Sequence, residues 1–232
     1  MESSTAVQIQ NVLEKEVPVR RSTAAVQHIF YVSLPVVSGS RAYLFVKRVF
    51  DITGALAAGT VLLIPMLVIA ALIRLDSPGP ALFKQERLGK GGKAFTILKF
   101  RSMRLDAEEN GPQWADENDD RCTRIGRILR KSRLDELPQL WNIFKGEMSF
   151  VGPRPERACF YDEFETYIHG FRNRLLVKPG LTGLAQVNGG YDLKPEEKIV
   201  FDMDYIENRS IGMDLHCILM TVRLIFTHEG AR

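Results

Sequence analysis

The stretch ITGALAAGTVLLIPMLVIAALI, residues 52–73, contains no charged residue and decides how the chain is organised. About 20 apolar residues are enough for a helix to cross a lipid bilayer. Pro65 interrupts the run, where a proline removes a backbone hydrogen bond and clashes with the preceding turn. Basic residues flank both ends, namely Arg41, Lys47 and Arg48 before the run and Arg74, Lys84 and Arg87 after it.

These flanks favour a re-entrant helix over a straight one. A straight span would carry one basic cluster across the membrane, against the tendency of basic residues to stay on the cytoplasmic side. A helix that enters, bends at Pro65 and returns to the same face avoids this. Carbonyls freed at the bend would need partners such as Thr60, water or a neighbouring helix. A transmembrane helix with a proline kink is the alternative on these residues alone.

Composition indicates an ordinary folded chain. Its 232 residues, 45% hydrophobic and with a net charge of +3, suit one domain with a substantial core and give no indication of a nucleic-acid partner. Three widely spaced cysteines and four scattered histidines argue against a disulfide framework or a structural zinc site, and favour a reducing compartment. The N-terminus lacks the pattern of a signal peptide.

Three parts follow along the chain. Residues 1–40 are expected to form a poorly ordered or accessory extension, residues 41–75 the re-entrant membrane helix, and residues 76–232 a separate folded domain. The predicted fold class is α/β, dominated by helices, with a small β-hairpin. The hairpin strands are expected at 81–86 and 93–100, an acidic loop at 106–120, and helices at 155–167, 195–208 and 214–226. The glycines of the hairpin turn lack the spacing of a phosphate-binding loop.

The stretch TRIGRILRKSRLDELPQLWNIFKGEMSFVGPRP, residues 123–155, carries most of the candidate chemistry. Arginines recur at every third position from 121 to 133, and Lys131 adds to them. On a helix this spacing winds slowly around one side. Such an array could lie on an anionic membrane surface, gather phosphates, or be a solvated basic face.

Asp135 and Glu136 follow this array directly. The spacing from Ser132 to Asp135 is that of a capping box, and locally a capping role is the stronger interpretation. A carboxylate at a helix N-terminus near arginines would also be held ionised, which suits a nucleophile. One carboxylate could then attack phosphorus while the other orients a metal ion or handles a proton.

Phosphate chemistry also needs cations. Lys99 and Arg101 in KFRSM and Arg154 in VGPRP are candidates, and Lys178 in KPGLTG is a weaker one. Pro153 and Pro155 would stiffen the backbone around Arg154. Each of these side chains could instead be a surface ion-pair partner.

Several motifs in fixed order resemble a known family. They are KRVFDI, the proline-broken apolar helix, SPGP, KFRSM, LRKSRLDELPQLWNIFKGEMSFVGPRP and KPGLTGLAQVNG. Together they resemble the bacterial sugar transferases, the monotopic polyprenyl-phosphate phosphoglycosyl transferases, over residues 41–232. One departure is Ile64, where family members often have serine before the helix-breaking proline.

The resemblance implies a reaction and roles for residues. A sugar-1-phosphate would pass from a UDP-sugar to a polyprenyl phosphate such as undecaprenyl phosphate, with UMP released. Asp135 would attack the β-phosphorus, and Glu136 would act through Mg²⁺, which both carboxylates would hold, or as a proton acceptor. Arg130 and Arg154 would bind phosphate, and Pro65 would break the membrane helix. Residues 76–232 would then be a cytoplasmic catalytic domain with interfacial helices. The expected location is the cytoplasmic face of the bacterial inner membrane, in contact with phospholipid, and a homo-oligomer is left open.

Two rival functions remain. Asp202-Met203-Asp204 matches the DxD motif of metal-dependent glycosyltransferases, although its surroundings read as a helix. A non-catalytic membrane-surface adaptor would use the basic helix to bind lipid.

Overall fold

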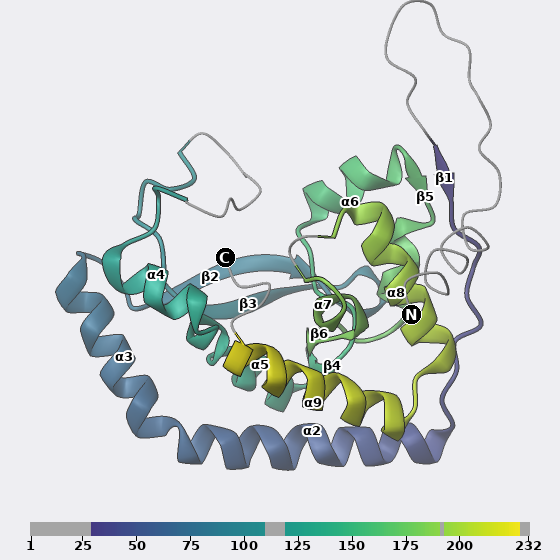
Figure 1. The fold of residues 1–232 in the computed structure, drawn as a ribbon, viewed down its shortest axis with the longest axis horizontal. Helices are drawn as coiled ribbons and strands as arrows, with labels where there is room; N and C mark the ends of the chain where they lie inside the picture. The colour runs from purple at the N-terminus through teal and green to yellow at the C-terminus, as the bar shows by residue number, and fades with distance from the viewer. Residues whose placement is uncertain (1–28, 110–118, 191–192, 228–232) are drawn as a thin grey trace, which may run out of the picture.

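The structure is a computed structural model that describes residues 29–109, 119–190 and 193–227. The apolar run forms two helices, α2 (Arg41–Val61) and α3 (Leu63–Asp76). They meet at a bend of 62°, and α2 lies along the base of the molecule while α3 rises from its end (Figure 1). Within the described residues, no single helix is long and apolar enough to cross a membrane. The two helices of the bent pair together meet these criteria of length and composition.

The bend lies one turn before Pro65, at Leu62. A proline at position 65 cannot donate to the carbonyl of Val61, so the break falls where that helical bond is missing. The ladder is intact on both sides, because the amide of Leu62 donates to Ala58 at 2.8 Å and the amide of Met66 donates to Leu62 at 2.8 Å. The Thr60 hydroxyl donates to the carbonyl of Leu56. The expectation that Thr60 serves a carbonyl freed by the proline is therefore wrong.

The first helix of the pair is tied to the rest of the molecule near its N-terminal end. Lys47 forms an ion pair of 2.8 Å with Asp214. Arg48 donates to the carbonyls of Ile143 and Phe144, each at 2.8 Å. Buried Asp51 accepts hydrogen bonds from the Ser149 hydroxyl and the Phe150 amide, each at 3.0 Å.

The far end of α3 is tied to the same domain. Arg101 donates to the carbonyls of Ser77 and Pro78, which follow the last turn of α3. Asp76 accepts a hydrogen bond from the amide of Ile125, at the start of α4 (Arg124–Lys131). Both ends of the bent pair therefore attach to one folded body.

The hairpin predicted from the sequence is present. Strand β2 (Leu82–Leu88) pairs antiparallel with β3 (Ala94–Phe100), from Leu82 opposite Phe100 to Leu88 opposite Ala94. The turn between them contains a short 3₁₀ helix, η1 (Lys90–Gly92), in which Gly91 and Gly92 have φ of 71° and 74°. Only glycine adopts such angles without strain.

Two short parallel pairs complete the strands. Strand β4 (Ser149–Val151) pairs with β6 (Gly180–Thr182), and β1 (Phe30–Tyr31) pairs with β5 (Ile168–His169). Residues 30–38 thus contact the domain, since Ser38 also donates to the carbonyl of Ile206. The role of the N-terminal extension stays a prediction. Residues 1–28 lie outside the described part.

Helices make up most of the remainder and confirm a mixed, helix-dominated α/β fold. The segment predicted as a helix at 195–208 is α8 (Pro195–Asn208), and the predicted 214–226 lies within α9 (Ile211–Thr227). The predicted 155–167 forms only the shorter α6 (Ala158–Glu165). The other helical segments are η2 (Leu134–Glu136), α5 (Gln139–Lys145), η3 (Phe171–Leu176) and α7 (Leu184–Val187). The predicted acidic loop is described only at its two ends.

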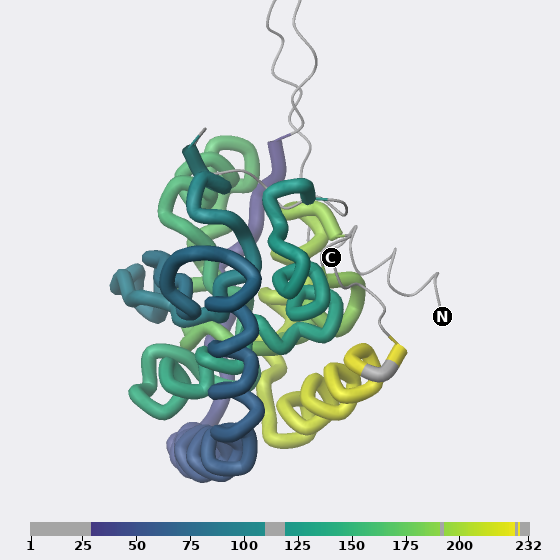
Figure 2. The backbone as a smooth tube through the Cα atoms, turned by 90° about the vertical axis from the view of Figure 1, so that its left-hand side faces the viewer, coloured from purple at the N-terminus to yellow at the C-terminus, as the bar shows by residue number. Residues whose placement is uncertain are grey.

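The bent helix pair shares its buried side chains with the domain. Ala55 of α2 packs in a cluster with Ile97 and Ile143, and Ile73 of α3 packs with Phe100 and Leu129. Burying such an aliphatic side chain contributes about 1.5–3 kcal/mol. Figure 2 shows α2 end-on beneath the domain. The helix pair therefore packs against the domain and contributes to its hydrophobic core.

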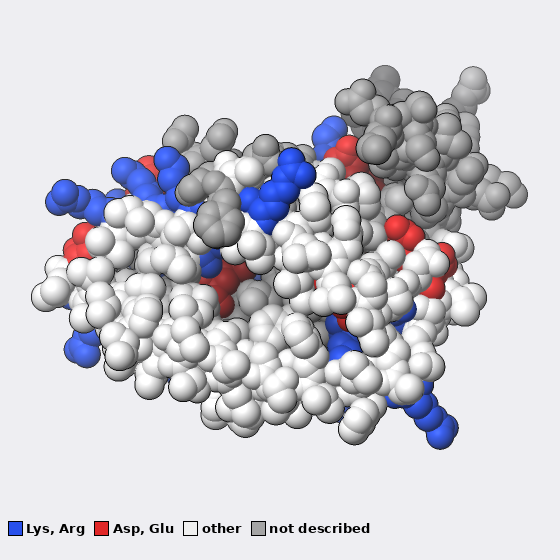
Figure 3. Space-filling model, turned by 60° about the horizontal axis from the view of Figure 1, so that its bottom comes forward, with Lys and Arg blue, Asp and Glu red and all other residues white. Residues whose placement is uncertain are grey.

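The opposite faces of these helices are apolar and exposed. Figure 3 shows the base of the molecule, on which few charged side chains appear. The most exposed large apolar side chains on the helix pair are Leu75 at 83%, Val61 at 76% and Ile64 at 74%. Leu219 of α9 and Trp141 of α5 are also more than half exposed. An apolar surface of this extent is unusual for a soluble monomer and indicates contact with lipid or protein.

Candidate active site

Asp135 and Glu136 lie in η2, the single 3₁₀ turn after α4. The residue before this turn, Arg133, has a left-handed backbone with φ of 57°, the only such non-glycine residue in the described ranges. The Ser132 hydroxyl donates back to the carbonyl of Ile128 at 2.8 Å, which ends α4. The predicted capping box is therefore wrong, because Ser132 closes the preceding helix and does not open the next one.

Glu136 is held by two of the predicted phosphate-binding cations. Its Oε1 accepts from Lys99 Nζ at 2.9 Å and from Arg154 Nη2 at 2.5 Å. Burial by itself would raise the pKa of Glu136, but the charges and hydrogen bonds of Arg154 and Lys99 outweigh it and hold that pKa well below its ordinary value. Glu136 is therefore ionised in the neutral pH range.

Asp135 differs from its neighbour. It is buried, at 9% exposure, and burial raises the pKa of its carboxyl to about 6, with a further contribution from the charge of Glu136. Lys99, Arg154 and Arg130 act in the opposite direction without cancelling the shift. The expectation that the arginines keep this carboxyl fully ionised is wrong in direction, although it still carries its charge above pH 6.

The two carboxylates face a cavity of about 400 Å³. Four predicted cations line it with them, Lys99, Arg101, Arg130 and Arg154. The rest of the lining combines apolar side chains, among them Phe83, Met103, Leu105 and Phe160, with further charged ones, among them Arg87, Glu108 and Glu156. A cavity of this size with convergent charged groups is typical of a small-molecule site.

Arg101 and Lys178 differ from the other candidates. Arg101 lines the cavity, but its terminal nitrogens are engaged by the Ser77-Pro78 turn, so the contacts that it makes are structural. Lys178 lies outside the cavity, near Arg48 of α2, where burial and the charge of Arg48 lower its pKa. A phosphate-binding role for either stays a prediction.

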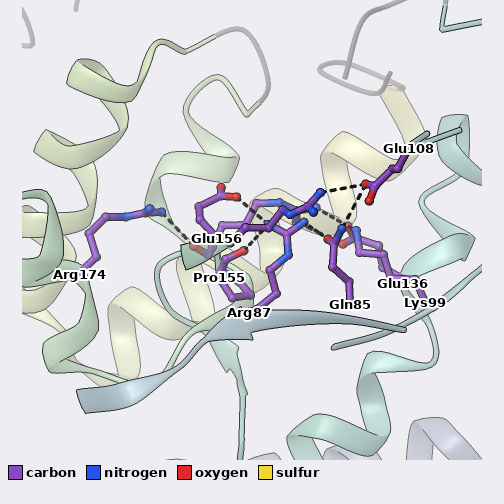
Figure 4. Close-up of polar contacts among 10 residues, drawn as sticks. Gln85, Arg87, Lys99, Glu108, Glu136, Pro155, Glu156 and Arg174 are labelled. Atoms are coloured by element: carbon purple, nitrogen blue, oxygen red, sulfur yellow. Dashed lines mark hydrogen bonds and ion pairs between the residues drawn. The ribbon is translucent and has the colours of Figure 1, made fainter. Parts of the chain in front are cut away.

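The structure adds residues that the sequence gave no reason to choose. Arg87 donates to Glu156 at 2.9 Å, and Glu108 accepts from both Gln85 and Arg157 (Figure 4). These side chains come from β2, the loop after β3 and the start of α6, and they meet at the rim of the cavity. No local pattern marks them, since they are brought together only by the hairpin packing against residues 154–157.

The DxD sequence lies in the middle of α8, as its surroundings predicted. Asp202 is fully buried in an ion pair of 2.6 Å with Arg174. Asp204 accepts a hydrogen bond from Asn208, one turn further along the same helix. Neither carboxylate lines the cavity.

The donor set at Asp135 and Glu136 fits a magnesium ion. Among the described residues there is no group of three or more acidic, histidine or cysteine side chains that could hold a metal alone. Mg²⁺ commonly takes only one or two carboxylates and completes its shell with water and substrate phosphates. Two adjacent carboxylates beside a cationic cavity therefore suffice.

Comparison with known proteins places this chain in a family. Residues 42–228 match the model of the bacterial sugar transferase family. The chain is 45% identical over 196 residues to a UDP-N-acetylgalactosamine-undecaprenyl-phosphate N-acetylgalactosaminephosphotransferase of Aeromonas hydrophila, which covers 83% of this chain and 46% of that protein. It is 46% identical over 193 residues to a UDP-glucose:undecaprenyl-phosphate glucose-1-phosphate transferase of Caulobacter vibrioides, covering 80% of this chain and 71% of the relative.

A further relative is close to this chain in length. The exopolysaccharide production protein PSS of Rhizobium leguminosarum bv. phaseoli is 44% identical over 191 residues, which cover 77% of this chain and 94% of that protein. By contrast, the chain spans about half the length of the Aeromonas protein. The family match covers most of the chain, including the helix pair and the cavity. This chain therefore belongs to the bacterial sugar transferase family.

Proposed function

We propose that this chain transfers a sugar-1-phosphate from a UDP-sugar to undecaprenyl phosphate, at the start of surface-polysaccharide assembly. The names of its relatives describe such transfers of glucose and N-acetylgalactosamine phosphates. The observation that carries the proposal is the position of Asp135, a buried carboxylate that shares one cavity with Glu136, Lys99, Arg130 and Arg154.

In the first step a carboxylate oxygen of Asp135 attacks the β-phosphorus of the donor. The bond between this phosphorus and the oxygen that bridges to the α-phosphorus breaks, and UMP leaves with that oxygen. A phosphosugar then remains on the Asp135 carboxylate as an acyl phosphate. Lys99, Arg130 and Arg154 offset the negative charge that develops on the phosphoryl oxygens.

In the second step a phosphate oxygen of the lipid attacks the same phosphorus. The bond from phosphorus to the Asp135 oxygen breaks, which frees the carboxylate and yields a polyprenyl-diphosphate-linked sugar. Asp135 and Glu136 would hold Mg²⁺, which supplies positive charge against the substrate phosphates when bound.

Glu136 suits a positioning role better than that of a base. Its pKa is held below the ordinary range by Arg154 and Lys99, so it is a weak proton acceptor near neutral pH. Its ion pairs place both cations beside Asp135. Glu136 thereby keeps the phosphate-binding groups in place before the donor arrives.

The membrane arrangement follows from the bent pair. Because both ends of α2 and α3 attach to one domain, the 62° bend would enter the lipid and both ends would stay on one face. The exposed apolar side chains of α2, α3 and α9 would contact lipid, and few charged side chains appear on the base of the molecule in Figure 3. This re-entrant arrangement brings the cavity close to a lipid phosphate at the cytoplasmic surface of the inner membrane.

The proposal is tested with the purified chain in lipid nanodiscs containing undecaprenyl phosphate. Each of several UDP-sugars is supplied with Mg²⁺, and released UMP and UDP are separated. We expect UMP with at least one donor and, without lipid acceptor, a phosphosugar mass on the peptide that contains Asp135. Asp135→Asn should release no UMP, whereas Asp204→Asn, which alters the DxD sequence, should remain active. Release of UDP would contradict the proposal and favour the rival glycosyltransferase.

A non-catalytic adaptor is the other rival. It gives no reason for a buried carboxylate with a raised pKa to share a cavity with eight basic side chains. Membrane binding by the wild-type chain without UMP release from any donor would favour it.

A further inference from the structure

A second, smaller pocket opens beside the main cavity. Its volume is about 30 Å³. Three of its lining residues, Arg133, Arg154 and Glu156, also line the main cavity, so the two spaces adjoin at Arg154. We call it the side pocket; its remaining walls are Arg174, Ala185, Gln186, Gly190 and Lys198.

Gln186 is the one residue in the lining of the side pocket that has a side-chain amide. It lies in α7 and is buried, at 8% exposure. Its Nε2 donates to the carbonyl of Leu181 at 3.3 Å, but its Oε1 is buried with no hydrogen-bond partner among the described residues. Leaving a buried polar atom unsatisfied is unfavourable, so such an atom commonly has a partner that arrives with a ligand or water.

The surroundings offer both donors and acceptors. Lys198, from α8, is largely buried, and this burial lowers its pKa. Glu156, which also lines the side pocket, is an acceptor and forms an ion pair with Arg87 of β2. A mixed set of this kind suits a neutral group that both donates and accepts a hydrogen bond, which is the chemistry of a hydroxyl.

We propose that the side pocket receives one hydrogen-bonding substituent of the donor sugar, and that Gln186 and Lys198 thereby select the sugar. The proposal rests on the proposed function, because it assumes that a phosphosugar lies at Asp135. At about 30 Å³, against about 400 Å³ for the main cavity, the side pocket has room for about one or two waters, so it admits a hydroxyl or hydroxymethyl group and excludes a sugar ring.

The sugar is the part of the donor that reaches this place. It is joined by one oxygen to the phosphorus that Asp135 attacks, and Arg154 lines both spaces beside that position. The uridine is too large for the side pocket and needs the larger cavity. The substituent would also stay in place while the phosphosugar is bound to Asp135.

The test compares donors that differ at one substituent. Steady-state UMP release is measured with UDP-glucose, UDP-galactose and their 2-acetamido counterparts, for wild type, Gln186→Met and Lys198→Met. Methionine nearly matches the volume of glutamine and keeps the packing while it removes the amide. Gln139→Met is the matched control, because Gln139 is also buried and its Nε2 has no partner among the described residues, but it lines neither space.

We expect the ratio of kcat/KM between the preferred donor and its epimer to fall by about tenfold or more in Gln186→Met or Lys198→Met, since one buried hydrogen bond is lost. Inhibition by UMP should change less than about twofold, and Gln139→Met should keep the wild-type ratio. An unchanged ratio in both variants overturns the inference and indicates a pocket that holds only water. An equal loss for all donors overturns it as well.

The same experiment distinguishes failure of the proposed function from failure of the side-pocket inference. If wild type releases UMP from none of the donors, the proposed function fails first. If it releases UMP and forms the adduct on Asp135 but all donors react equally, only the side-pocket inference fails.

Discussion

The carbonyl oxygen of Arg154 accepts a hydrogen bond of 3.0 Å from Nη2 of Arg174. Arg174 is itself fixed, because its Nε donates to Asp202 at 2.6 Å within a fully buried ion pair. The backbone of Arg154 is thereby anchored to η3 and α8, while its side chain reaches Glu136. The Arg174–Asp202 ion pair, which includes the first aspartate of the DxD sequence, thus supports Arg154, for which we propose phosphate binding.

Breaking this pair should affect stability and catalysis differently. We expect Arg174→Met alone to lower the free energy of unfolding by about 3–5 kcal/mol, because Asp202 is left buried without its counterion. The double variant Arg174→Met/Asp202→Leu should regain most of that loss, since an apolar pair tolerates burial. Its kcat for UMP release should stay about tenfold or more below wild type, because Arg154 remains unanchored. Thermal unfolding and steady-state kinetics measure the two effects.

A purely structural role for Arg174 makes a different prediction. In that case the double variant would regain kcat together with stability. Arg172→Met serves as the control, because Arg172 is an exposed arginine of the same 3₁₀ helix.

The pH dependence of the first half-reaction should report on Asp135. Its pKa in the fold is raised to about 6, and only the ionised carboxylate is a nucleophile. The rate of adduct formation should therefore be constant above pH 7 and fall about tenfold per pH unit below 6. Single-turnover UMP release without lipid acceptor isolates this step. Saturating Mg²⁺ should move the midpoint to lower pH if the ion lies beside the carboxylate.

Removing the charge of Asp135 should stabilise the fold at neutral pH. A carboxyl whose pKa is raised by folding binds protons more tightly in the folded state, so its ionisation opposes folding above pH 6. We expect Asp135→Asn to raise the melting temperature at pH 7.5, with the gain shrinking as the pH falls towards 4. A lower melting temperature at pH 7.5 would contradict this electrostatic account.

Glu136→Gln should have the opposite effect on stability at neutral pH. The pKa of Glu136 is lowered in the fold, so its ionised form stabilises the protein above the unfolded pKa, and that contribution is lost as the pH falls. We expect Glu136→Gln to lower the melting temperature at pH 7.5 and to differ less from wild type below pH 4. Asp106→Asn, at an exposed ion pair with Arg104, should change little at either pH.

Membrane topology is tested with single cysteines in a background without Cys122, Cys159 and Cys217. Ser33→Cys precedes α2, and exposed Leu105→Cys follows α3. A re-entrant pair leaves both on the cytoplasmic side, so an impermeant maleimide should label neither in intact spheroplasts and both after lysis. Labelling of one position alone from outside would show that the helix pair crosses the membrane.

The sequence predicted what depends on local pattern. The hairpin and α8 follow from alternation, glycine turns and helical spacing, and these signals act within about 15 residues. The two parallel pairs were not predicted, since strands of two or three residues carry no periodicity. Asp135 and Glu136 stood out only through the motifs around them.

The errors in the site have a common cause. Ser132 has the spacing of a cap, but Arg133 turns left-handed and separates the two helical segments, which tertiary packing decides. Arg101 and Arg154 look alike in sequence, yet one holds the end of α3 and the other meets Glu136. The side pocket joins residues from 133 to 198, and no single window of sequence contains it.

The attachment of both helix ends has a consequence for biogenesis and engineering. Lys47, Asp51 and Asp76 find their partners only in segments made later in the chain, at residues 214, 149–150 and 125. A nascent chain that ends after α3 lacks every one of these restraints, so the angle between the helices is set only once the domain has folded. The pair is therefore not a portable anchor, and grafting residues 41–76 onto another protein would transfer its hydrophobicity without its topology.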